Sequence, residues 1–126
     1  MAIKSKLVQK VNPAKPADPK KFYANLVTRG EVSLRELAKE ISIISTVSSP
    51  DVMAVIESLL QIIPKHLALG EIVRLGEFGS YSVRLSSEGA ATEQTFNSSL
   101  IRGLNLNFRP GKEVEQVLQN ISYEKE

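Results

Sequence analysis

The sequence contains no cysteine and only one histidine among its 126 residues. Without cysteine the chain can form neither disulfides nor thiolate metal sites, and His66 alone cannot build a histidine-rich zinc site. No apolar run approaches the roughly 20 residues that a membrane-spanning helix needs. The first residues also lack the long apolar core of a signal peptide. We therefore expect a cytoplasmic protein with no metal, no cofactor, no membrane partner and no evident small-molecule substrate.

The charge of the chain is small but unevenly distributed. The net charge is +2, and apolar residues make up 42% of the chain, enough for one compact domain. Residues 1–30 carry seven Lys or Arg and one acid, a net of +6, whereas residues 31–126 carry nine basic and thirteen acidic residues, a net of −4. A polyanion would be drawn to the N-terminal segment. The same lysines would also keep an exposed edge strand soluble, and the sequence leaves both interpretations open.

Two short strands are predicted before the main domain. Residues 3–11 alternate between apolar and lysine positions, as a strand with one wet face does. A proline-rich connector follows over 12–19, and residues 21–28 form a second apolar and aromatic run. We interpret 1–30 as a basic N-terminal strand extension that precedes a domain over 31–126.

Two helices are predicted next. Ser33 and Glu36 fit a capping box at the start of a helix over about 33–43. Ser49 fits the N-cap of a second helix over about 50–69, with Pro50 at its first position. The apolar surface of this second helix extends around most of its circumference. A small domain cannot bury so much alone, so we expect a partner subunit to cover it.

The remainder of the chain predicts strands over 72–75, 78–85 and 104–109, a helix over 111–120, and a brief final strand over 121–123. Strands, two helices, three strands and a helix in this order indicate an α+β fold.

Two motifs carry a family resemblance. The first is Gly70–Arg84, which contains a Gly-Glu-Phe-Gly corner, and the second is Phe108-Arg109-Pro110-Gly111-Lys112. Together, and in this order after two helices, they resemble the histone-like DNA-binding family of bacterial HU and integration host factor over about 31–120. The N-terminal extension is similar to that of the HU-related branch in Bacteroides-type bacteria.

The resemblance implies an HU-like fold: two N-terminal helices, a three-stranded antiparallel sheet with an arm, and a short C-terminal helix, here preceded by the extra strand pair. It also implies an intertwined homodimer that binds double-stranded DNA, largely independently of sequence, and condenses it in the nucleoid. Family arms enter the minor groove with cations and an apolar wedge, usually proline.

The arm of this chain, over 84–107, departs from that pattern. It has no proline, and its two cations, Arg84 and Arg102, are matched by Glu88 and Glu93. Phe96 could act as the wedge, or it could fold back onto the core. Residues 98–101 fit a local turn or a docked segment better than a free ribbon. We therefore expect weaker bending of DNA than is typical of the family.

The resemblance and the charge distribution nominate DNA-binding residues. Arg84, Arg109 and Lys112 match basic positions of the family, and Arg74 and Arg102 are further candidates. The N-terminal segment offers further lysines that could bind phosphates: Lys4, Lys6, Lys10, Lys20 and Lys21. The alternative for each is an ordinary solvated charge.

No catalytic constellation is present in the sequence. No Ser/His/Asp set or ligand cluster emerges, and Gly76 and Gly79 serve backbone geometry, since no strand–loop–helix unit surrounds them. The sequence thus predicts a homodimeric, histone-like DNA-binding protein and not an enzyme. The alternative is a dimeric structural or protein-interaction module that kept an HU-like fold but weakened or lost DNA binding.

Overall fold

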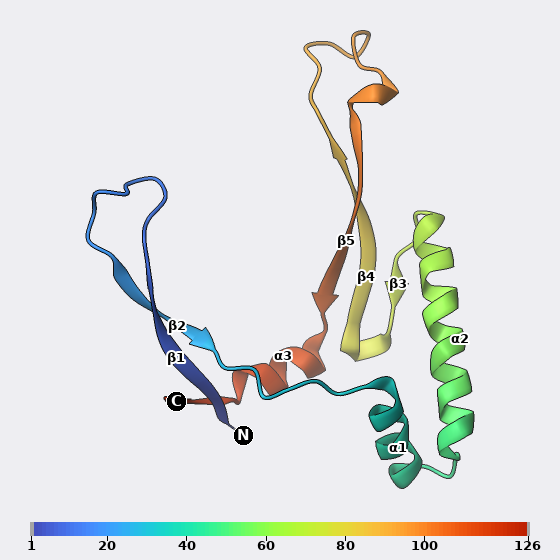
Figure 1. Ribbon diagram of the computed structural model, residues 1–126. Helices are drawn as coiled ribbons and strands as arrows, with labels where there is room; N and C mark the ends of the chain where they lie inside the picture. The colour runs from blue at the N-terminus through green and yellow to red at the C-terminus, as the bar shows by residue number, and fades with distance from the viewer. Residues whose placement is uncertain (1, 126) are drawn as a thin grey trace. The chain divides into compact units, whose positions relative to one another are not determined.

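The computed structural model describes residues 2–125, which form three α-helices and two three-stranded sheets in an α+β arrangement (Figure 1). They divide into two units. One unit runs to Glu31 and resumes at Gln116, and the other spans Val32–Glu115. The α+β class expected from the sequence is confirmed, as are the types and approximate bounds of its elements.

The smaller unit is a sheet with the strand order β2-β1-β6. Strand β1 (Ala2–Lys10) pairs antiparallel with β2 (Lys21–Leu26), and the two form the strand pair expected at the N-terminus. Strand β6 (Ser122–Lys125) adds to the other edge of β1 in parallel. The sequence predicted all three strands but not this pairing, which joins the first and last described segments of the chain.

The larger unit begins with two helices. In α1 (Leu34–Ile44), Ser33 is the N-cap as predicted, and its hydroxyl accepts a hydrogen bond from the Glu36 N–H. In α2 (Ser49–Ala68), the predicted cap Ser49 is wrong. The cap is Ser48, whose hydroxyl accepts from the Asp51 N–H at 3.4 Å. The reason is that the Val52 N–H already donates to the Ser48 carbonyl at 3.0 Å, which starts the helix one residue early.

The second sheet has the order β3-β4-β5 and is antiparallel throughout. Strand β3 (Val73–Arg74) is followed by a 3₁₀ turn, η1 (Gly76–Phe78), and by β4 (Gly79–Ser87). Strand β5 (Ile101–Pro110) starts three residues before the predicted position, because Ser86 and Ser87 still pair with Gly103 and Ile101 beyond a bulge. Strands β4 and β5 thus form a long two-stranded ribbon, seen in Figure 1.

The two sequence motifs meet at the base of this ribbon. A Cβ on Gly111 would lie 2.1 Å from the Glu77 carbonyl oxygen, and one on Gly79 would lie 2.6 Å from the Arg109 carbonyl oxygen. The Gly111 N–H also donates to the Phe78 carbonyl at 2.8 Å. Only glycine permits such close approach. The Gly-Glu-Phe-Gly corner and the Pro-Gly turn are therefore two halves of one backbone contact, after which α3 (Lys112–Gln119) begins.

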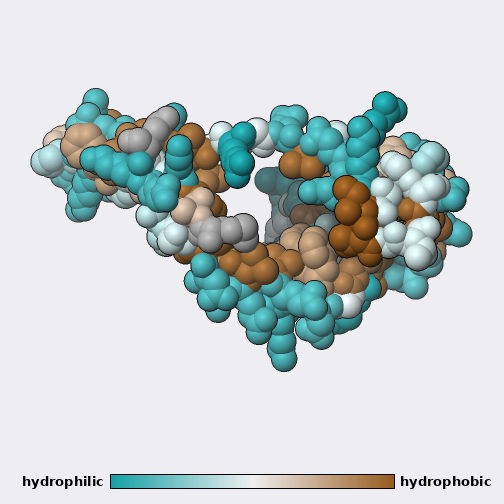
Figure 2. Space-filling view, turned by 90° about the horizontal axis from the view of Figure 1, so that it is seen from below, coloured by the Kyte–Doolittle hydropathy of each residue, from teal (hydrophilic) through white to brown (hydrophobic). Residues whose placement is uncertain are grey.

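Little of the apolar surface is covered within the described residues. Among residues 2–125, the buried hydrophobic residues are Ala38 of α1 and Val52 and Leu67 of α2. Figure 2 shows apolar side chains, coloured brown, lying open on the face seen from below. Ile43 and Ile44 are 81% and 85% exposed.

Among residues 2–125, no helix combines the length and apolar character needed to cross a membrane.

Candidate nucleic-acid interface

A row of polar side chains crosses the three strands of the second sheet. Arg74 of β3 pairs with Ser80 of β4, and Ser80 pairs with Arg109 of β5. Directly paired residues of an antiparallel sheet project from the same face. Two of the sequence-nominated cations, Arg74 and Arg109, therefore lie on one face with a serine hydroxyl between them.

The same face stays polar along the ribbon. Side chains alternate between the two faces of a strand, so β4 places Ser82, Arg84 and Ser86 beside Ser80. Strand β5 places Asn107 opposite Ser82 and Asn105 opposite Arg84. We call this set the polar face: Arg74, Ser80, Ser82, Arg84, Ser86, Asn105, Asn107 and Arg109. It offers cations and uncharged hydrogen-bonding groups, and it carries no carboxylate.

The opposite face of the sheet is apolar. Its members are Val73, Tyr81, Val83, Leu85, Leu104, Leu106 and Phe108. At the base of the ribbon the Phe108 ring contacts Tyr81 and Phe78, with centroid distances of 4.8 and 5.7 Å. These ring contacts confirm the assignment of faces that the register gives, so the chemistry of the two faces is sharply divided.

A fourth cation nominated from the sequence, Lys112, lies beside the polar face at its base. A concavity of about 330 Å³ is lined by Arg74, Ser80, Arg109 and Lys112, together with Glu77 and Glu115. Three cations and two carboxylates leave a net charge of +1 there. The concavity lies beside the contact of Gly79 and Gly111, so the backbone next to Arg109 and Lys112 is closely packed.

The N-terminus of α3 would bind an anion less strongly than a free helix N-terminus would. The Gly111 N–H already donates a hydrogen bond to the Phe78 carbonyl oxygen, and Glu113 and Glu115 occupy the first turn of the helix. These two carboxylates already complement the positive end of the helix dipole. An anion at this corner must therefore be held by the side chains of Arg74, Arg109 and Lys112.

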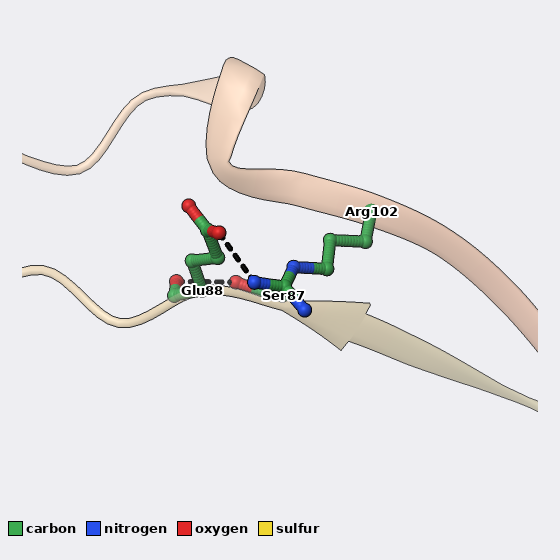
Figure 3. A network of polar contacts seen from close by, with 3 residues as sticks. All are labelled: Ser87, Glu88 and Arg102. Atoms are coloured by element: carbon green, nitrogen blue, oxygen red, sulfur yellow. Dashed lines mark hydrogen bonds and ion pairs between the residues drawn. The ribbon is translucent and has the colours of Figure 1, made fainter.

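Arg102 has a different environment from the other nominated cations. Figure 3 shows it reaching from β5 to the Glu88 carboxylate, just past the end of β4, with which it forms an ion pair. The Ser87 hydroxyl donates to the Glu88 carbonyl oxygen at 2.8 Å in the same network. The pair closes the ribbon below its tip and cancels the charge of Arg102.

The tip of the ribbon is an ordered loop without cations. The Glu88 N–H donates to the Leu100 carbonyl, and the Thr92 and Thr95 hydroxyls each accept from the other's N–H. Residues 98–100 form a 3₁₀ turn, η2 (Ser98–Leu100), as predicted, whereas Ile101, which was predicted to belong to the turn, begins β5. Phe96 is 41% exposed, and with Ala90, Ala91, Thr92 and Glu93 it lines a concavity of about 380 Å³ within the loop.

The N-terminal lysines belong to the other unit. Lys4, Lys6 and Lys10 occupy alternate positions of β1 and so share one face of its sheet, while Lys20 lies in the connector before β2. Among the described residues no group of three His, Cys, Asp or Glu side chains could hold a metal ion.

Sequence reasoning missed the uncharged members of the polar face, Ser80, Ser82, Asn105 and Asn107. The signal was present, because serines alternate with apolar residues in β4 and asparagines do so in β5. These residues are uncharged, so the distribution of charge does not reveal them. Hydroxyl and amide groups nevertheless make many of the hydrogen bonds that proteins form with DNA phosphates and sugars.

Comparisons with known proteins give a family match over nearly the whole chain and a solved structure of similar fold. Residues 1–125 match the sequence model of the family HU-HIG, described as an HU domain fused to wHTH, Ig, or a glycine-rich motif. Among solved structures, the chain is similar to a "Putative bacterial DNA binding protein" from Bacteroides vulgatus ATCC 8482, with a TM-score of 0.66 at 14% identity. The alignment covers 98% of this chain and 47% of that one, so the chain spans about half the length of its neighbour. At this identity the likeness is one of fold. Comparison with curated proteins gives no match.

Proposed function

Because the chain belongs to the HU-HIG family of HU domains fused to other modules, we propose that it binds double-stranded DNA through the polar face of the sheet β3-β4-β5. The observation that carries the proposal is the division of the sheet: cations, hydroxyls and amides lie on one face, and aliphatic and aromatic side chains lie on the other. The fold of a solved protein described as DNA-binding supports it.

The groups on the polar face suit phosphate and sugar contacts. Arginine guanidinium groups bind phosphate through two parallel hydrogen bonds, and Arg84 and Arg109 project from neighbouring strands of the ribbon. Asn105 and Asn107 supply amide donors and acceptors between them. Contacts of this kind position a protein on the duplex without reading its sequence, so the binding is expected to be largely sequence-independent.

The arm is proposed to grip DNA weakly. Arg102 is paired with Glu88, and the tip has no proline, so two features by which minor-groove arms bend DNA are reduced. Phe96 is the apolar side chain at the tip that could insert between bases. Weak arms predict modest bending, with affinity dominated by the polar face.

A homodimer is the proposed form, because a single chain exposes too much apolar surface. On α1, the side chains of Ile43 and Ile44 are 81% and 85% exposed. On α2, the exposed residues Val55, Leu59 and Ile62 form a stripe at helical spacing that continues from the buried Val52. A second copy that packs on this stripe would cover it symmetrically.

The proposed cellular role is that of a histone-like, non-enzymatic protein of the bacterial nucleoid, in the cytoplasm. The alternative is a dimeric module that interacts only with proteins. Nothing in the polar face favours that alternative, since a protein-binding surface usually places aromatic and apolar groups at its centre.

A salt series tests the proposal. Fluorescence anisotropy of a labelled duplex is measured with wild-type protein and with the variant Arg84→Ala/Arg109→Ala/Lys112→Ala. Each phosphate contact contributes about 0.9 to the slope of log affinity against log salt, so the variant should lose about 2.7. The charge-matched control is Arg35→Ala/Lys39→Ala/Lys65→Ala on the helices, which should keep the wild-type slope. Absence of wild-type binding at low salt would overturn the proposal.

A further inference from the structure

We propose that the N-terminal sheet β2-β1-β6 carries a second phosphate-binding surface for duplex DNA, formed by Lys4, Lys6, Lys10 and Lys21. This inference rests on the proposed function, but it concerns a different unit of the chain and a different set of residues.

The strand register gathers the lysines on one face. Lys6 pairs with Asn25, Lys10 with Lys21, and Val8 with Tyr23, so these six side chains project together. An independent contact agrees, because the Lys10 Nζ lies 5.9 Å from the centre of the Tyr23 ring. Lys21 thus joins the face from β2, although it is remote from the other lysines in sequence.

The charge of this lysine face is largely uncompensated. The face holds one acid, Glu124 of β6, which pairs in register with Lys4. The ion pairs of the described residues, His66–Glu71 and Arg102–Glu88, both lie in the other unit. All four lysines are exposed, so their ammonium groups are available to a polyanion.

The opposite face of the sheet explains why the lysines stay in solvent. The register places Ile3, Leu7, Phe22, Leu26 and Tyr123 there, and Phe22 and Tyr123 are 65% and 80% exposed. Any protein surface that packs on this sheet will cover the apolar face, because burial of unpaired lysines is costly. The lysine face is therefore the one that remains outward.

The dimensions of the lysine face suit a rod-like polyanion. Strands rise about 3.3 Å per residue, so Lys4 and Lys10 are separated by about 20 Å along β1. A DNA strand advances about 3.4 Å along the helix axis per phosphate, so this length matches about six phosphates of one strand. Lys4, Lys6 and Lys10 can therefore each reach a phosphate, with no requirement for a base sequence.

The test uses the full chain and the same labelled duplex. The variant Lys6→Ala/Lys10→Ala should lower the salt slope by about 1.8, equivalent to two phosphate contacts. The charge-matched control Lys39→Ala/Lys65→Ala should leave the slope unchanged, and Lys6→Arg/Lys10→Arg should retain it because the charges are kept. Circular dichroism establishes that each variant is folded.

Combination with the polar-face variant separates this inference from the proposed function. If the lysine face is a second surface, its loss of slope should add to the loss caused by Arg84→Ala/Arg109→Ala/Lys112→Ala. Unchanged slope in Lys6→Ala/Lys10→Ala, with steep binding by wild type, would overturn the inference and leave the proposed function intact. The same variant is also tested on vesicles of phosphatidylserine and phosphatidylcholine. Loss of vesicle binding with an unchanged DNA slope would assign the face to an anionic membrane and overturn the inference as well.

Discussion

The glycine contact between the two motifs makes a sharp prediction for Gly111→Ala. The new Cβ would lie 2.1 Å from the Glu77 carbonyl oxygen and 2.6 Å from its carbonyl carbon, whereas ordinary contact begins near 3.4 Å. Both partners are backbone atoms, so no side-chain rotation can relieve the clash. The two segments must move apart by about 1 Å or more, the shortfall between 2.1 and 3.4 Å.

Two costs follow from that displacement. Forcing an extra methyl group into a closed contact costs about 1–3 kcal/mol. The hydrogen bond from the Gly111 N–H to the Phe78 carbonyl, now 2.8 Å, would stretch beyond useful length, and its loss costs about 0.5–1.5 kcal/mol. We therefore expect Gly111→Ala to lower the free energy of unfolding by about 2–4 kcal/mol.

Urea denaturation at one fixed protein concentration measures this change. With a slope of about 2 kcal/mol/M, the middle of the range for a small protein, the midpoint should fall by about 1–2 M. The matched control is Gly89→Ala, since a Cβ there meets nothing within 4 Å, and it should be neutral or slightly stabilising. Equal midpoints for Gly111→Ala and wild type would refute the glycine contact.

Two further predictions concern the arm and the helices. The variant Glu88→Gln replaces the carboxylate by an amide and releases Arg102 for phosphate contact, so the slope of log DNA affinity against log salt should steepen by up to about 0.9. Stability should change little, because the ion pair is exposed. A slope equal to that of wild type would show that the ion pair does not mask Arg102. Leu59→Lys places a charge in the exposed stripe of α2, so light scattering should give a monomer mass or the chain should unfold. The control Gln61→Lys should remain dimeric. A dimer mass for folded Leu59→Lys would contradict the proposed interface.

Local patterning predicted the elements of the fold well because most of them carry their own signals. The cap at Ser33 and the alternation in β4 are properties of neighbouring residues, and the structure confirms both. The cap of α2 was misplaced by one residue because Ser48 and Ser49 are equally good caps in sequence. Which of them acts depends on where the first helical hydrogen bond forms.

Contacts between distant segments could not be predicted in the same way. The brief strand predicted over 121–123 is present as β6, but its pairing with the edge of β1 could not be predicted, because it joins segments that are far apart in the sequence. Residues 101–103 belong to β5 because the end of β4 pairs with them across the bulge. In both places tertiary pairing decides the structure, and intrinsic preference does not.

The candidate site was predicted in part. The cations Arg74, Arg84, Arg109 and Lys112 were found from motif positions, and the structure places them on or beside one face of the sheet. The neutralising contact of Arg102 depends on Glu88, fourteen residues away along the chain, and could be seen only in the folded ribbon. Each of these positions remains a proposed DNA contact.

The most direct test of DNA binding by the polar face is a nuclear magnetic resonance titration of the protein with a duplex. Asn105 and Asn107 carry side-chain amides on the polar face, whereas Val83 and Leu106 carry methyl groups on the apolar face of the same strands. We predict that the asparagine amide signals shift or broaden with added DNA while the methyl signals do not. Shifts confined to the methyl groups, or no shifts at low salt, would contradict the account.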